Sequence, residues 1–146
     1  MIERDVRLAN ESWEALLAAQ AAVMRGFAAE RIWEDVSLHE YDVLYALRKA
    51  GCALRQTDLT RSVLLSQPAL SRLLDRLEQR GLVTRAADPA DRRAVLVTMT
   101  EAGRVAQRET GTRHARSVEQ RMRVLDPAQQ RQLRDLCAAL VGSEER

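Results

Sequence analysis

Residues 66–99, SQPALSRLLDRLEQRGLVTRAADPADRRAVLVTM, decide the fold of this chain. The first half predicts a helix, because Ser66 is a favourable N-cap and Pro68 is tolerated in a first turn. Four leucines recur at helical spacing and form an apolar stripe: Leu70, Leu73, Leu74 and Leu77. Gly81 ends this helix, and the apolar period then changes from helical to strand-like.

The second half of the stretch predicts a β-hairpin. Its strands are expected over residues 82–86 and 95–99, joined by a polar loop that contains Asp88, Pro89, Asp91, Arg92 and Arg93. The helix before it turns a polar face away from the leucines, with Pro68, Ser71, Arg72, Asp75 and Gln79 on it and Gln67 and Arg76 at its flanks. Such a helix suits the major groove of DNA, and a basic hairpin suits the backbone or the minor groove.

Helices are predicted on both sides of this stretch. Before it, apolar periodicity indicates a long helix over residues 9–29, a second that begins at Ser37 or Leu38 and ends at Gly51, and a short one over 56–62. After it, a long helix is expected from residue 100 or 101 to about 124, and a last one from Pro127 to about Val141. The predicted fold is therefore mainly α, with a small two- to three-stranded β wing.

Composition indicates a single-domain globular protein with one locally basic region. The chain has 146 residues, of which 46% are apolar, so one continuous domain with helical extensions is expected. The net charge is only +2, but residues 55–93 hold eight arginines against five acids. The N-terminal segment is charged and no apolar run is long enough for a membrane span, so we expect a cytoplasmic protein without a membrane partner.

Neither a metal site, nor a cofactor, nor an enzyme is predicted. Cys52 and Cys137 form no CxxC pair, and His39 and His114 lie far apart in sequence, so no zinc-ligand spacing is present. We expect both cysteines to be buried thiols that pack as small hydrophobes. The sequence has no glycine-rich phosphate loop and no GxSxG nucleophile motif.

The whole pattern resembles the MarR family of winged helix-turn-helix transcription regulators. The resemblance covers nearly the whole chain and is carried by short motifs in the helices and the hairpin. These are Asp58-Leu59, residues 66–73, Asp75-Arg76-Leu77-Glu78, Gly81-Leu82-Val83, Arg85, Asp88-Pro89, Asp91-Arg92-Arg93, Thr98, Thr100 and Gly103. The resemblance implies a winged DNA-binding unit over residues 35–100, with dimerisation helices over 1–34 and 101–146.

A member of this family would bind a double-stranded, palindromic operator as a homodimer, most often as a repressor. Carried over position by position, the resemblance puts Ser66, Gln67, Pro68, Ser71, Arg72 and Arg76 near bases and phosphates. In the wing, Arg92 or Arg93 would enter the minor groove, and Asp91 would brace a neighbouring arginine. Two simpler interpretations stay open: Arg72 and Arg76 could pair with Asp75 or Glu78 on a solvated face, and the wing arginines could be ordinary turn charges.

The resemblance also implies a small aromatic or phenolic effector. Trp13, Trp33, His39 and Tyr41 lie on or between the first two predicted helices and could line a pocket for it. Core packing explains Trp13 and Tyr45 equally well, and His39 could be a surface or capping residue. Redox-sensing members keep a cysteine near the start of the first helix, where this sequence has none. The competing function is a protein-interaction or architectural DNA-binding module that responds to no small molecule.

Overall fold

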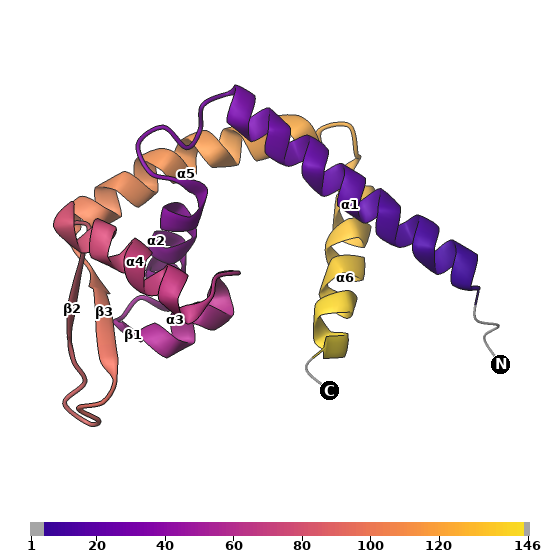
Figure 1. Ribbon diagram of the computed structural model, residues 1–146. Helices are drawn as coiled ribbons and strands as arrows, with labels where there is room; N and C mark the ends of the chain where they lie inside the picture. The colour runs from indigo at the N-terminus through magenta and orange to yellow at the C-terminus, as the bar shows by residue number, and fades with distance from the viewer. Residues whose placement is uncertain (1–4, 145–146) are drawn as a thin grey trace. The chain divides into compact units, whose positions relative to one another are not determined.

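A computed structural model describes residues 5–144 of the chain. The elements follow in the order α1 (Val6–Ala29), α2 (Leu38–Ala50), β1 (Leu54–Arg55), α3 (Gln56–Ser62), α4 (Gln67–Gln79), β2 (Val83–Ala87), β3 (Val95–Met99), α5 (Glu101–Met122) and α6 (Pro127–Glu144) (Figure 1). The chain divides into two compact units, Met1–Arg113 and His114–Arg146, with the boundary inside α5. The predicted fold class, mainly α with a small β wing, is confirmed.

The wing is part of a three-stranded antiparallel sheet with the order β1-β3-β2. Val83 pairs with Met99 at one end of the β2–β3 hairpin and Ala87 with Val95 at the other, so the strands are in register along their whole length. Leu54 pairs with Val97 on the opposite side of β3. The two residues of β1 are too short a run to be predicted from alternation, and they form a strand because β3 offers them a free edge. The hairpin projects beyond the helices beside it (Figure 1).

The hydrophobic core lies under α4 and fixes which face of that helix is exposed. All four leucines of the predicted stripe are at most 3% exposed. They belong to one buried cluster with Leu44 and Leu47 of α2, Leu59 of α3 and Val97 of β3. Since the stripe is completely covered, the opposite face of α4 must point to solvent.

Capping residues close the ends of α2 and the start of α6. The hydroxyl of Ser37 accepts a hydrogen bond from the Glu40 N–H at 3.2 Å, while the Glu40 carboxylate accepts from the Ser37 N–H at 3.1 Å, which completes a capping box. Gly51 ends α2 with a φ of 68°, a conformation that glycine adopts without strain. Asp126 and Gln129 form the predicted reciprocal cap of α6.

The start of α5 is held tightly against the turn between α4 and β2. The Thr100 N–H donates to the Leu82 carbonyl at 3.1 Å, and the Thr100 hydroxyl donates to the Gly81 carbonyl at 2.6 Å. A Cβ on Gly103 would lie 2.1 Å from the Leu82 carbonyl oxygen and 2.8 Å from Cγ of Met99. Glycine at position 103 is therefore what permits this close approach.

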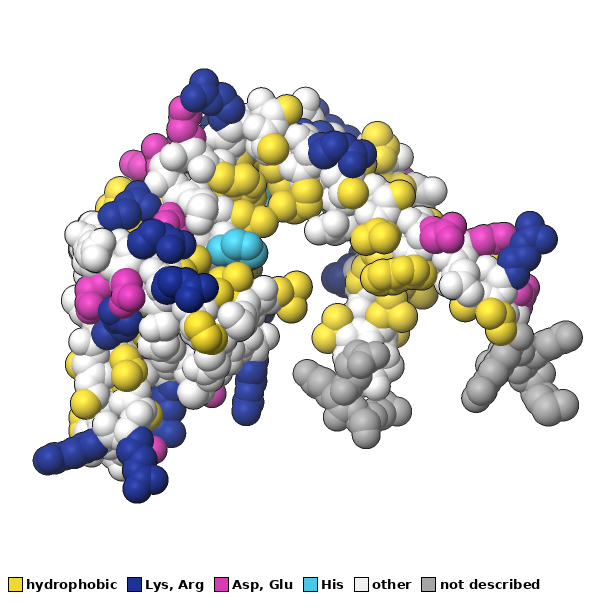
Figure 2. Space-filling model, in the orientation of Figure 1, with side chains coloured by type: hydrophobic (Ala, Val, Ile, Leu, Met, Phe, Trp, Pro, Cys, Tyr) yellow, Lys and Arg dark blue, Asp and Glu magenta, His cyan; other side chains and the backbone are white. Residues whose placement is uncertain are grey.

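Both terminal helices expose apolar side chains. On α1, Val6, Leu8, Trp13 and Leu17 are each more than half exposed, and on α6 the same holds for Leu136, Leu140 and Val141. Figure 2 shows uncovered hydrophobic side chains along α1. Amphipathic helices that stay uncovered within one chain are typical of surfaces that pack against a partner.

The prediction that both cysteines are buried is wrong. Cys52 is exposed, because it lies in the turn where the chain leaves α2 after Gly51. Cys137 is only half-buried. It shares the apolar stripe of α6 with Leu136 and Leu140, and that stripe is itself largely exposed.

Candidate nucleic-acid interface

The outward face of α4 carries the residues that the sequence singled out for DNA. Ser66 caps the helix, because its hydroxyl oxygen accepts a hydrogen bond from the Ala69 N–H at 3.3 Å. That role uses the oxygen lone pair and leaves the hydroxyl proton able to donate elsewhere. Gln67, Pro68, Arg72 and Arg76 are exposed and Ser71 is half-buried. The buried leucines therefore present all six side chains along one accessible surface.

Arg85 of β2 engages the two acids that share this surface. Its guanidinium forms ion pairs with the carboxylates of Asp75 and of Glu78, the latter at 3.1 Å, and its backbone N–H donates to Glu78 at 2.9 Å. The hydrogen bond to Asp75 is the main cause that raises the pKa of Arg85. Within residues 5–144, neither Arg72 nor Arg76 has an ion-pair partner.

The wing loop is built around the buried side chain of Asp88. This carboxylate accepts a hydrogen bond from the Ala90 N–H at 2.9 Å and forms an ion pair with Arg55 of β1 at 2.7 Å. The Ala90 N–H is the larger cause that lowers the pKa of Asp88, and the Arg55 guanidinium adds to it. Asp88 thus joins the wing loop to β1 and fixes the conformation of the loop.

Arg92 and Arg93 are exposed in the loop at the tip of the wing. Asp91 accepts a hydrogen bond from the backbone N–H of Arg93 at 3.1 Å. Its carboxylate therefore braces the backbone of its neighbour, and among the described side chains no ion pair joins Asp91 to either arginine. Both guanidinium groups extend from a fixed loop into solvent.

The other end of α4 is tied to the start of α2 and to α5. Arg80 donates one hydrogen bond to the Glu40 carboxylate at 2.9 Å and another to the backbone carbonyl of Asp35 at 2.6 Å. Arg113 of α5 forms an ion pair with the Asp35 carboxylate at 2.6 Å. Sequence reasoning missed these contacts, because the partners lie 40 or more positions apart and no local pattern connects them.

The structure brings together only two of the four candidate effector residues. The rings of Trp33 and Tyr41 lie 5.4 Å apart, and Phe27 packs against Trp33 at 6.2 Å. His39 is exposed at the first turn of α2. Trp13 is 59% exposed and lies fourteen residues before Phe27, about 21 Å along the axis of α1.

The aromatic cluster is larger than the sequence indicated. Tyr45 stacks on Tyr41 with ring centroids 6.0 Å apart, although it is 46% exposed and so is not a core residue. Burial raises the pKa of the Tyr41 phenol above its ordinary value. Phe27 could have been found from its place in the apolar stripe of α1, whereas its contact with Trp33 depends on the turn between α1 and α2.

These elements define a winged helix-turn-helix protein: α3 and α4 form the helix-turn-helix, and β2 with β3 forms the wing. The sequence model of the MarR family matches residues 34–94. The multiple antibiotic resistance protein MarR of Salmonella typhimurium is 36% identical over 69 residues, which are 47% of this chain and 47% of that protein. The match thus spans about half the length of each.

Solved structures extend the likeness over almost the whole chain. A probable transcriptional regulator from Pseudomonas aeruginosa has 29% identity and a TM-score of 0.75, covering 92% of this chain and 99% of that one. BpsR of Bordetella bronchiseptica, whose DNA binding is regulated by 6-hydroxynicotinic acid, has 25% identity and a TM-score of 0.80, covering 97% and 96%. Residues 34–94 are thus similar to the MarR family, and the fold of almost the whole chain is similar to that of solved transcription regulators. Among the described helices, none is both long and apolar enough to cross a membrane.

Proposed function

We propose that this protein is a sequence-specific DNA-binding transcription regulator. One observation carries the proposal: the arginines on the outward face of α4 and at the wing tip are exposed and unpaired within residues 5–144, while the acids beside them are engaged elsewhere. Asp75 and Glu78 bind Arg85, and Asp88 binds Arg55. Arg72, Arg76, Arg92 and Arg93 are therefore available to phosphates and base edges.

The geometry of the wing and of α4 supports contact with two grooves. A helix fits the major groove, where Arg72 and Arg76 can reach guanine or phosphate, with Ser66, Gln67, Pro68 and Ser71 close to the backbone and base edges. The narrow wing fits the minor groove, into which Arg92 or Arg93 would extend from the turn that Asp91 braces. A cytoplasmic location follows from DNA as the partner.

We infer that the regulator binds as a homodimer. The exposed apolar side chains of α1, Leu8, Trp13 and Leu17, and those of α6, Leu136 and Leu140, support a second copy as the partner of the terminal segments 1–34 and 101–146. Two-fold symmetry would place two α4 helices on half-sites about one helical turn apart in a palindromic operator. Sedimentation of the free protein tests this point, since a monomer would contradict it.

The aromatic cluster supports a small aromatic or phenolic effector, and repression as the mode of action. The rings of Trp33 and Tyr41 lie 5.4 Å apart, and such a pair suits a flat aromatic ligand. 6-Hydroxynicotinic acid, which regulates the DNA binding of the similar protein BpsR, is such a ligand. We propose that such a ligand weakens operator binding, and 6-hydroxynicotinic acid is the first compound to titrate.

Selection from a genomic DNA library at two salt concentrations tests the function. A regulator should recover one palindrome that survives the higher salt, because base contacts add to the electrostatic attraction. Recovery of DNA without sequence preference, lost as salt rises, would favour the architectural alternative. No DNA at either salt concentration would favour a protein-interaction module.

Two substitutions then assign the contacts on the recovered operator. Arg72→Ala should weaken binding about 5- to 150-fold and relax the base preference at one position of each half-site. Arg93→Ala should weaken binding to all sequences and reduce the salt dependence by about one ion per site. Arg25→Ala is the matched control, because Arg25 is an exposed arginine of α1 outside both elements. If all three variants bind as the parent does, the assignment of the site is wrong.

A further inference from the structure

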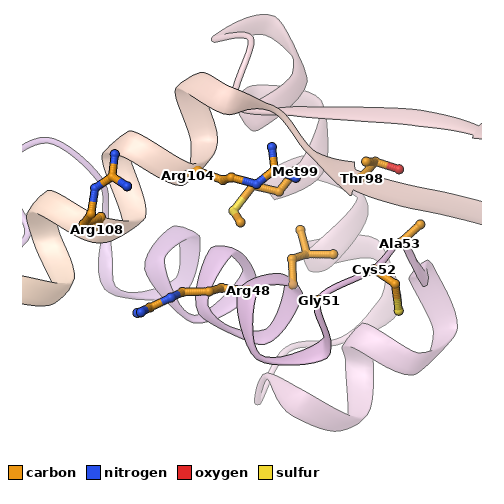
Figure 3. A pocket seen from close by; sticks show the side chains of 9 residues that line it. Arg48, Gly51, Cys52, Ala53, Thr98, Met99, Arg104 and Arg108 are labelled. Carbon is orange, nitrogen blue, oxygen red and sulfur yellow. The ribbon is translucent and has the colours of Figure 1, made fainter.

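A cavity of about 260 Å³ lies between the end of α2, the chain that leads into β1, the end of β3 and the first turns of α5. Its lining comprises three arginines, three apolar residues and three others: Arg48, Arg104 and Arg108; Leu47, Ala53 and Met99; Gly51, Cys52 and Thr98 (Figure 3). None of these residues belongs to α4, to the wing tip or to the aromatic cluster. The function proposed above therefore makes no use of this cavity.

The charge of the cavity is one-sided. Three of its nine lining residues are arginines and none is acidic. Arg104 has a partner in Glu101, at 3.5 Å and with both side chains more than half exposed, which is a weak pair. Arg48 and Arg108 have no ion-pair partner within residues 5–144. Guanidinium groups gathered without acids around a concave surface raise the local concentration of anions.

The cavity also has an apolar floor, which separates it from a plain patch of surface charge. Leu47 is 2% exposed and Met99 is 8% exposed, so both are fixed by the core. The floor stays open at Gly51, where an added Cβ would meet no atom within 4 Å. Such a combination of apolar surface with a few convergent polar groups is typical of a small-molecule site.

The two ends of the cavity differ in polarity. In Figure 3, Arg48 and Arg108 lie toward one end, and Cys52, Ala53 and Thr98 lie toward the other. Backbone carbonyls at the end of α2 give the region around Gly51 a partial negative charge. The anionic group of a ligand is therefore favoured between Arg48 and Arg108, with its apolar part over Leu47 and Met99.

We propose that this cavity binds a small organic anion, one that carries a phosphate or carboxylate group on a short apolar body. Guanidinium groups bind both oxyanions through charge-assisted hydrogen bonds, often two at a time. The floor of Leu47 and Met99 removes the apolar body from water. The cavity joins β3 to α5, so an occupant would contact the wing strand at the end opposite its tip.

Phenyl phosphate is the probe, because it combines an oxyanion with a ring of suitable size, and inorganic phosphate is the comparison. Calorimetric titration of the full chain without DNA should give saturable binding of one phenyl phosphate per chain, about tenfold or more tighter than inorganic phosphate. Arg48→Gln and Arg108→Gln should each weaken binding about tenfold. Arg131→Gln is the matched control, because Arg131 is an exposed arginine of α6 that does not line the cavity.

A second measurement locates the probe. Phenyl phosphate should slow the alkylation of Cys52 by N-ethylmaleimide, while Cys137, which lies on α6 outside the lining, should react at an unchanged rate. Equal affinity for both phosphates, equal loss in the Arg131→Gln variant, or the absence of Cys52 protection would each overturn the proposal. The protein is free of DNA throughout, so failure here leaves the proposed regulator function untouched.

Discussion

Replacing Gly103 by alanine should destabilise the fold, although alanine is the better helix former. Gly103 is the third residue of α5, and a Cβ there would lie 2.1 Å from the Leu82 carbonyl oxygen. That oxygen belongs to the backbone and accepts the Thr100 N–H at 3.1 Å. Relief of the overlap must move the start of α5 away from the turn after α4, because neither partner is a flexible side chain.

Three energy contributions decide whether Gly103→Ala raises or lowers the free energy of unfolding. Helix propensity alone favours alanine by about 0.5–1 kcal/mol. Overpacking at a close contact costs about 1–3 kcal/mol, and loss of the Thr100 hydrogen bond costs about 1 kcal/mol more. The steric and hydrogen-bond costs exceed the gain, so we expect a net loss of about 2 kcal/mol in the free energy of unfolding.

Urea unfolding followed by circular dichroism measures this loss at a fixed protein concentration. Gly142→Ala is the matched control, because Gly142 lies third from the end of α6 and an added Cβ there meets nothing within 4 Å. That variant should be as stable as the parent or up to about 1 kcal/mol more stable. If Gly103→Ala gained stability together with the control, the overlap with the Leu82 carbonyl would be relieved at no cost, and the expected loss would be wrong.

Substitutions at three further residues test the core, the wing and the anchoring of α4. Leu74→Ala should cost about 2–5 kcal/mol in urea unfolding, since Leu74 is fully buried, and a cost under 1 kcal/mol would contradict the packing. Because the folded pKa of Asp88 is lowered, its stabilisation is present above about pH 4 and is lost as the pH falls further. The stability difference between the parent and Asp88→Asn should therefore shrink toward pH 3, and a constant difference would count against it. Glu40→Gln keeps the cap of α2 but removes the charge that Arg80 binds, so it should cost about 1 kcal/mol and Glu40→Ala should cost more. If both Glu40 variants unfold like the parent, the contact contributes nothing.

Whether the arginines on α4 are free to bind DNA depends on which partners the acidic side chains of the same helix take. Asp75 lies three residues after Arg72 on the same helix, so sequence alone allows these two side chains to pair there. The structure directs both acids to Arg85 instead, because β2 places that guanidinium between the two carboxylates. The net basic charge of residues 55–93 is therefore concentrated on the side chains that face outward.

Sequence determined the local structure of this protein. Helix caps at Ser37, Ser66 and Asp126, the leucine stripe of α4 and the β2–β3 hairpin were all predictable, because each depends on residues close to one another in the sequence. The same local motifs, taken together, were sufficient to indicate the winged helix-turn-helix fold and the similarity to the MarR family.

Only the tertiary structure decided which distant residues meet. The ion pair of Arg55 with Asp88 spans 33 positions and that of Arg80 with Glu40 spans 40, so no sequence periodicity could have paired them. The structure also leaves Trp13 exposed and outside the aromatic cluster, and it places Cys52 in an exposed turn. Three arginines from α2 and α5 line one cavity. All of these outcomes have the same physical reason. The local sequence pattern determines whether a side chain lies on the buried or the exposed face of its own helix or strand. Which residues of other elements it then contacts depends on how the helices and strands pack together.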